Sequence, residues 1–292
     1  SLEKALKKAV ECAESLSEVK KAAIQKLPEV KLAQGTFKHE GYEELLKMTL
    51  EEKLSHVRKA EEEMRHASSF VQSATCRYNE LFENKVVVTT DGANAVSSLA
   101  RNELAFRAFV DHQGSHADGF QSLGRTGTWD CLFNRNTLSE LAQKTSKLAV
   151  DLAKAPLVSG GLKTLILSPS MVGLLSHEAI GHTVEADFVL SGSVANGKLG
   201  QVVGSPLVTL CDSGVVHSAK FGGGDLLVDD EGVATQVTTI IEKGVLKSYL
   251  HNRESAALFN VEPTGNGRAW LYHDEPIIRM RNTYLLPGTS SL

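Results

Sequence analysis

Two histidines and a glutamate lie within six residues of one another and have the chemistry of a hydrolytic metal site. They are His177, Glu178 and His182, in the run His-Glu-Ala-Ile-Gly-His. Two neutral imidazoles bind one metal ion and leave a coordination position for water, whose pKa the metal lowers to about 7. A carboxylate beside the first ligand can take a proton from that water. The three residues therefore predict a metallopeptidase, with His177 and His182 as metal ligands and Glu178 as the catalytic base.

The spacing of five between the two histidines requires an unusual helical turn. In an ideal α-helix, side chains five positions apart diverge by about 140° and cannot share a metal ion. A π-type turn holds one more residue and brings such positions to one face, and these turns concentrate at functional sites. Gly181 lies inside this turn, where the missing side chain relieves crowding. We predict a π-type or distorted turn from His177 to His182. Histidines that serve only packing are the alternative.

Three further groups are candidates for binding a metal or another cation, or for supporting such a site, and each has a plainer interpretation. Glu185 follows His182 by three positions, and would hydrogen-bond an imidazole and fix its tautomer, bind the metal itself, or lie in solvent. Cys211 and His217 are candidates for a third ligand, although a cysteine after an apolar strand is commonly a small buried hydrophobe. The acidic run 229–231 would bind a cation or form a charged turn.

The elements that position these residues follow from the apolar pattern. A capping box of Thr49 and Glu52 begins one of three predicted helices, and Ser168-Pro169 is the start of the helix that carries the histidines. Alternating and β-branched stretches indicate strands, separated by a turn at residues 91–92 and a glycine-rich loop. The predicted helices span 2–25, from Thr49 to about Val71, and 137–155; the strands lie within 76–111 and at 164–167, 207–210, 237–242 and 245–249; the loop spans 114–127.

These elements predict an α+β fold in which an antiparallel or mixed sheet is covered by helices. A β-rich segment with the histidine helix follows it. The glycine pair at 160–161 is the best candidate boundary, which gives an N-terminal α+β domain at residues 1–160. The second unit, residues 161–292, holds the histidine helix and the start of a β-rich C-terminal domain.

Composition excludes several classes of protein. The 31 basic and 35 acidic residues give a net charge of -4, so we expect no nucleic-acid partner, which would require a basic face. The sequence has no run of 18 apolar residues, so no membrane span is expected. The four cysteines form no CxxC pair, which favours a reducing compartment. Because no signal peptide opens the sequence, we expect a cytoplasmic protein.

Several separated motifs resemble those of the TldD/PmbA family, also called the modulator-of-DNA-gyrase family, and specifically its TldD type. The first is the stretch from Leu174 to Phe188, which looks like that family's HExxxH helix. The later motifs occur in the family's order. They are Asp-Asp-Glu-Gly at 229–232, Pro-Thr-Gly-Asn-Gly-Arg at 263–268, Asn-Thr-Tyr at 282–284 and Leu-Pro-Gly at 286–288. The resemblance is looser from Thr49 to Lys163.

The resemblance implies a zinc-dependent peptidase that hydrolyses unfolded or flexible peptides in their maturation or degradation. His177 and His182 carry over as zinc ligands and Glu178 as the base. Arg268, in the 263–268 motif, would hold a substrate carboxylate or carbonyl, although a structural salt bridge is an equal alternative.

The family also implies a partner and a missing part. The expected partner is a PmbA-like chain in a heterodimer, or a second copy in a homodimer. The family's third zinc ligand is a cysteine of a C-terminal domain that this chain is expected to lack, together with part of the N-terminal domain. The fragment is therefore expected to bind zinc weakly or not at all and to be inactive alone. A non-catalytic partner or regulatory subunit of a protease complex is the alternative function.

Overall fold

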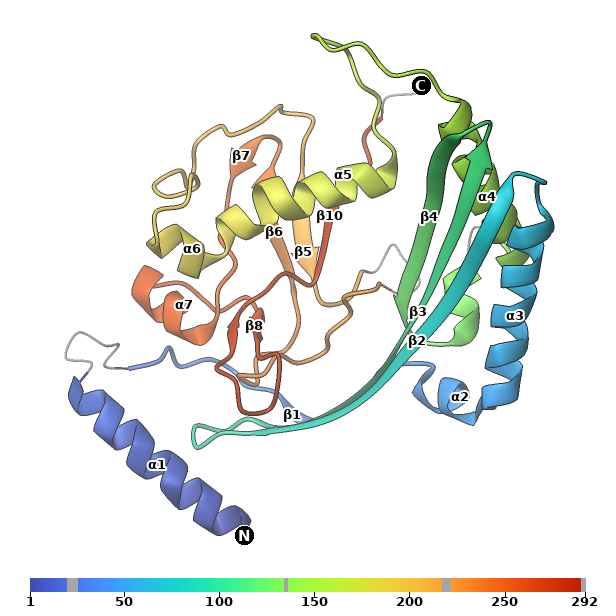
Figure 1. The fold of residues 1–292 in the computed structure, drawn as a ribbon. Coiled ribbons are helices and arrows are strands. Elements are labelled where there is room, and N and C mark those ends of the chain that lie inside the picture. The colour runs from blue at the N-terminus through green and yellow to red at the C-terminus, as the bar shows by residue number, and fades with distance from the viewer. Residues whose placement is uncertain (20–25, 134–135, 217–221, 290–292) are drawn as a thin grey trace.

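The computed structural model describes residues 1–19, 26–133, 136–216 and 222–289. A long, curved sheet has two helices on one face and the C-terminal half of the chain on the other (Figure 1). The first helix, α1 (Leu2–Val19), lies apart from both (Figure 1). Mixed sheets with helices confirm the predicted α+β fold class.

The curved sheet is built around one long antiparallel hairpin. Its strands β2 (Val71–Val88) and β3 (Asn94–His112) pair over their whole length, with one irregularity near Val71. The predicted turn at 91–92 joins them. β4 (Ser115–Thr126) pairs antiparallel with the distal part of β3, and β1 (Gln34–Lys38) pairs parallel with its beginning.

Two helices with the same start signal cover one face of this sheet. In α3 (Leu50–His66) and α4 (Leu138–Lys154), a threonine accepts the backbone N–H three residues on, and the glutamate there accepts the threonine's N–H. This reciprocal cap satisfies two orphan donors and confirms the predicted start at Thr49. Both helices pack on the sheet through fully buried residues, among them Met64, Leu104, Phe106 and Ala142. The short helices α2 (Tyr42–Lys47) and η1 (Trp129–Phe133) flank them.

The glycine-rich loop predicted for residues 114–127 is wrong, because this stretch forms β4. Its glycines mark a close approach: a Cβ added to Gly119 would overlap the Thr145 carbonyl oxygen and lie 2.9 Å from the Ala149 nitrogen. The strand therefore needs glycine where α4 lies directly on its backbone.

The C-terminal half holds the histidine helix over a second sheet. α5 (Pro169–Leu175) continues into the π-helix η2 (Ser176–Gly181) and the 3-10 turn η3 (His182–Val184), and α6 (Ala186–Leu190) follows. The sheet has the strand order β10-β5-β6-β7. The remaining elements are β5 (Leu210–Ser213), β6 (Val237–Glu242), β7 (Val245–Leu246), α7 (Arg253–Phe259), β8 (Gly267–Arg268), β9 (Ile277–Ile278) and β10 (Asn282–Leu285).

Several elements predicted from the sequence need correction. The strand predicted at 164–167 is not formed: the stretch is exposed, and no described strand pairs with it. The strand predicted at 207–210 begins only at Leu210, because Val208 donates to the Ser205 carbonyl in a turn that contains Pro206. The helix predicted from Thr49 to about Val71 ends at His66, and Val71 begins β2. The predicted end of the first helix, within residues 20–25, lies outside the described residues. Of the hairpin predicted for 237–242 with 245–249, the first strand forms as β6, whereas the second is shorter than predicted, because β7 covers only Val245–Leu246.

Polar contacts join the two halves of the chain. Lys85 of β2 forms a 2.5 Å ion pair with Asp230, and the guanidinium of Arg253 bonds Asp91. His39 hydrogen-bonds the buried Asp225 at 2.9 Å. Within the described ranges, no helix is long and apolar enough to cross a membrane.

Candidate metal centre

The two histidines converge because the helix between them is a π-turn. Residues 176–181 are π-helical, and the His182 N–H donates to the His177 carbonyl, five residues back. The two imidazole centroids lie 4.7 Å apart, with their planes nearly perpendicular at 86°. The predicted turn is confirmed, and the two rings share one face as the spacing argument required.

Close packing behind the turn explains why glycine stands at position 181. Gly181 is buried, and a Cβ added to it would overlap the sulfur of Met280 and lie 2.9 Å from the Met280 methyl carbon. Met280 is itself buried in the core of the C-terminal half. The turn is therefore held from behind by a side chain for which the sequence pattern gave no signal.

Glu185 orients the second imidazole. Its Oε2 lies 2.9 Å from His182 Nδ1, and the Glu185 side chain is fully buried. Burial raises the pKa of Glu185, while the hydrogen bond to His182 acts in the opposite direction. When Nδ1–H donates to this carboxylate, Nε2 carries the lone pair that a metal requires. The guanidinium of Arg279 lies 3.9 Å from the same Oε2.

His177 and Glu178 lie on the exposed side of the π-turn. Both side chains are exposed, whereas Ser176 before them is buried and donates to the Val172 carbonyl at 2.8 Å. In the sequence, Glu178 follows directly after His177. The geometry thus presents two converging imidazoles, with the carboxylate of Glu185 bonded to the second of them.

The described residues supply no third ligand. Among them, no group of three or more His, Cys, Asp and Glu side chains is arranged to hold a metal ion. Cys211 is buried in β5 with its sulfur 3.9 Å from the Thr239 hydroxyl, and burial raises the pKa of its thiol. A raised pKa disfavours the thiolate that zinc binds. His217 lies outside the described residues.

The acidic run 229–231 is a buried turn whose oxygens are engaged by the backbone. Asp229 accepts the N–H groups of Val233 at 2.8 Å and Gly267 at 3.0 Å. Burial raises the pKa of Asp229 to about 6 and that of Glu231 to about 7. The run is therefore a turn that is hydrogen-bonded to the 263–268 motif. This agrees with the charged-turn alternative.

A buried ion pair supports the same motif from the other side. Asp212 and Arg281 are fully buried and 2.9 Å apart, and Asn266 donates to the same carboxylate at 2.9 Å. Arg268 donates to the Met280 carbonyl at 3.1 Å and, among the described residues, has no ion pair. Burial lowers the pKa of Arg268. This contact places Arg268 against Met280, the residue that packs behind Gly181.

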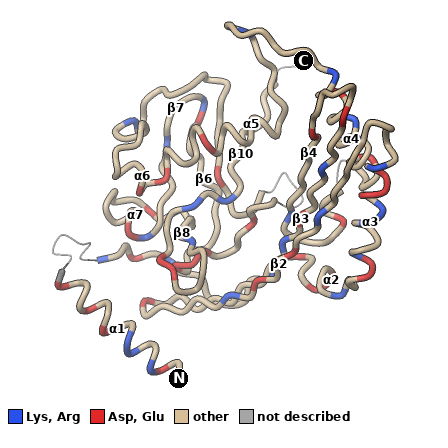
Figure 2. Tube along the Cα trace, viewed as in Figure 1, with Lys and Arg blue, Asp and Glu red and all other residues tan. Residues whose placement is uncertain are grey.

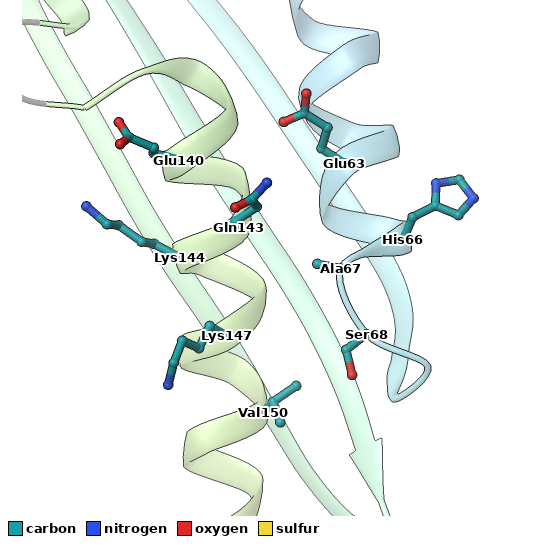
Figure 3. A pocket seen from close by; sticks show the side chains of 9 residues that line it. All are labelled: Glu63, His66, Ala67, Ser68, Glu140, Gln143, Lys144, Lys147 and Val150. Carbon is teal, nitrogen blue, oxygen red and sulfur yellow. The ribbon is translucent and has the colours of Figure 1, made fainter.

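A hollow of about 770 Å³ between α3 and α4 has no comparable chemistry (Figure 3). Several of its polar side chains already have local partners: Glu140 caps α4, Lys147 pairs with Asp151, and one oxygen of Glu63 accepts from Ser139. It lies on the opposite face of the curved sheet from the histidine helix (Figure 1).

Comparison with known proteins assigns the family. Residues 43–153 match the PmbA/TldA metallopeptidase central domain, and residues 160–292 match the PmbA/TldA metallopeptidase C-terminal domain. The chain belongs to the PmbA/TldD family. The family is one of metallopeptidases, and the second match places the histidine helix inside its C-terminal domain. Residues 161–292, which were expected to hold the histidine helix and the start of a β-rich C-terminal domain, thus fall within this match.

Relatives and a solved structure agree with this assignment. A metalloprotease of Methanothermobacter thermautotrophicus is 35% identical over 229 residues, which cover 77% of this chain and 49% of that one. A zinc metalloprotease TldD homologue of Saccharolobus solfataricus is 27% identical over 242 residues, 83% of this chain and 54% of that one. The structure of TldE from Thermococcus kodakarensis shares the fold, with a TM-score of 0.66, 17% identity and coverage of 92% and 59%. The PmbA/TldD chain described here spans about half the length of these relatives.

Proposed function

We propose that this chain carries the catalytic helix of a zinc-dependent peptidase that hydrolyses unfolded or flexible peptides. The observation that supports this function is the π-turn, which brings two imidazoles to a centroid distance of 4.7 Å, one of them bonded to the carboxylate of Glu185. A helix whose histidines served only packing would not need this turn. The family membership and the zinc metalloprotease relative support the same proposal.

Each residue has a distinct role in this proposal. His177 and His182 would hold zinc, which would supply Lewis acidity for activating water and a peptide carbonyl. Glu185 holds His182 in the tautomer that presents Nε2. Glu178 takes the proton of the attacking water and later delivers it to the leaving amine. Arg268 is proposed to bind a carboxylate or carbonyl of the substrate.

The third ligand is proposed to come from outside the described residues. Two imidazoles alone leave a zinc site open, whereas catalytic zinc sites commonly have three protein ligands. We therefore propose that the 292-residue chain binds zinc weakly or not at all and is inactive alone. The active assembly is proposed to be the full-length protein with a PmbA-like chain or with a second copy. Residues 1–160 and 161–292 are its two proposed units.

Peptide cleavage by the full-length protein tests the assignment. Zinc content by elemental analysis and cleavage of a flexible fluorogenic peptide are measured for the wild type, Glu178→Ala and His177→Ala. Loss of a catalytic base lowers kcat by about 100-fold or more, so Glu178→Ala should keep zinc and lose cleavage. His177→Ala should lose both.

A matched control removes a carboxylate away from the histidines. Glu242→Ala changes an exposed residue of β6 whose one ion pair among the described residues is with the exposed Lys247, and should leave zinc content and cleavage unchanged. If Glu178→Ala cleaves at the wild-type rate, the base assignment is wrong. Wild-type protein that cleaves without zinc refutes the metal mechanism.

A further inference from the structure

A half-exposed arginine lies beside the two histidines. Arg279 Nη1 is 3.9 Å from Glu185 Oε2, the oxygen that His182 Nδ1 contacts at 2.9 Å. The Arg279 side chain is 43% exposed, and among the described residues its guanidinium makes no hydrogen bond. A group that carries several N–H donors and a permanent positive charge is thus separated from a proposed zinc ligand by a single carboxylate.

The segment that carries Arg279 is held in place on both sides. The Arg279 N–H donates to the Asn266 carbonyl at 2.9 Å, and the Asn266 amide donates back to the Arg279 carbonyl at 2.9 Å. The flanking residues Ile278 and Met280 are buried, Met280 against Gly181. A binding group on a fixed segment needs little further ordering when its ligand arrives.

Neutralising Glu185 is the plainer role for Arg279, and the contacts do not fit it. A guanidinium that pairs with a carboxylate commonly forms two parallel hydrogen bonds of about 2.7–2.9 Å. Here the closest approach is 3.9 Å, beyond the range of a hydrogen bond. Glu185 Oε1 is buried and has no hydrogen-bond partner among the described residues. The guanidinium of Arg279 is therefore available to another anion.

Other basic side chains near the histidines are absent or engaged. Residues 169–184, which form the histidine helix and its turns, contain no lysine or arginine (Figure 2). Arg281 is buried in its ion pair with Asp212, and Arg268 donates to the Met280 carbonyl. Of these three arginines, Arg279 is the one whose guanidinium has no hydrogen bond among the described residues.

We propose that Arg279 binds a carboxylate of the peptide substrate and so holds the peptide beside His182. This inference rests on the peptidase function proposed above, and adds to it a preference for peptides with a negative charge. The planar fork of a guanidinium matches the two oxygens of a carboxylate. That carboxylate is the C-terminus of the peptide or the side chain of an acidic residue. The two sources share one chemistry, and matched peptides distinguish them.

Peptide binding, measured apart from cleavage, tests the assignment. Fluorescence anisotropy gives the affinity of the full-length Glu178→Ala protein for three labelled peptides of one sequence. One has a free C-terminal carboxylate, one is amidated, and one is amidated with an internal glutamine changed to glutamate. Because hydrogen bonds to charged groups are strong, at least one charged peptide should bind about 10- to 100-fold more tightly than the uncharged one. Binding requires no cleavage, so this preference holds or fails independently of the base assignment.

Substitutions of Arg279 assign the preference to its guanidinium. In the Glu178→Ala background, Arg279→Gln should reduce the preference to about twofold or less, whereas Arg279→Lys should keep part of it, because lysine retains the charge without the fork. Both variants should bind the uncharged peptide as before. Arg58→Gln, at an exposed position of α3, is the matched control and should keep the whole preference.

The outcomes that would overturn the proposal are specific. Charged peptides that bind no more tightly than the uncharged one would overturn it, and so would a preference that survives Arg279→Gln. Equal weakening of all three peptides by Arg279→Gln would show that Arg279 only supports the shape of the site. A preference lost in Arg268→Gln and kept in Arg279→Gln would assign the carboxylate to the other arginine.

Discussion

Replacing Gly181 by alanine separates the packing explanation of the π-turn from a simple effect of helix propensity. In an exposed helix, alanine is favoured over glycine by about 1 kcal/mol. Here the added methyl would overlap the Met280 sulfur and lie 2.9 Å and 3.3 Å from its two flanking carbons. Overpacking of this kind costs about 1–3 kcal/mol. We therefore expect Gly181→Ala to lower the free energy of unfolding by about 1–2 kcal/mol.

Urea unfolding followed by circular dichroism measures this loss, and a double-mutant cycle assigns its cause. Met280→Ala alone creates a cavity and should cost about 2–5 kcal/mol. With that side chain shortened, Gly181→Ala should become neutral or stabilising, so the two changes should couple by at least about 1 kcal/mol. In the full-length protein, chelator competition should show weaker zinc binding for Gly181→Ala. A Gly181→Ala protein as stable as wild type, with unchanged zinc affinity, would refute the reasoning.

Three further predictions follow from the buried charges. Glu185→Gln should lower zinc affinity of the full-length protein about 10- to 100-fold in chelator competition, and unchanged affinity would show that this carboxylate does not orient His182. Burial raises the pKa of Glu231 from 4.5 to about 7. The stability that the protonated carboxyl contributes is therefore fully present below pH 4.5 and is lost as the pH rises through 7. Relative to Glu231→Gln, the wild type should thus lose on the order of 1–2 kcal/mol of unfolding free energy between pH 5 and 8, allowing for partial exposure; a pH-independent difference contradicts the raised pKa. Arg281→Met leaves its carboxylate partner buried and unpaired, and should cost about 3–5 kcal/mol in urea unfolding, whereas Arg279→Met, at a half-exposed position, should cost far less.

Local signals in the sequence predicted the parts of the fold that depend on local chemistry. The capping pair Thr49 and Glu52 located a helix start because its hydrogen bonds join residues three apart. The π-turn was predicted from a geometric requirement: only a wider turn lets His177 and His182 share a face. In both cases, the interacting groups lie within one helical turn.

The remaining features depend on residues distant in the sequence. Gly119 resembles a loop residue until α4 is placed on the strand. Met280 lies 99 positions from Gly181, and Asp212 meets Arg281 across 69 positions. No periodic pattern links such pairs. The stretch 164–167 has the composition of a strand, but the described chain offers it no neighbour.

The exposed connection between the two halves has a consequence for handling the protein. Residues 157–167 are exposed and make no backbone hydrogen bond with other described residues, so a protease meets an extended chain there and should cut it first. The pieces should nevertheless migrate together in native gels. Asp230 is bonded to Lys85, and Arg253 to Asp91, on opposite sides of the cut. A nicked preparation would thus pass for intact material until it is denatured.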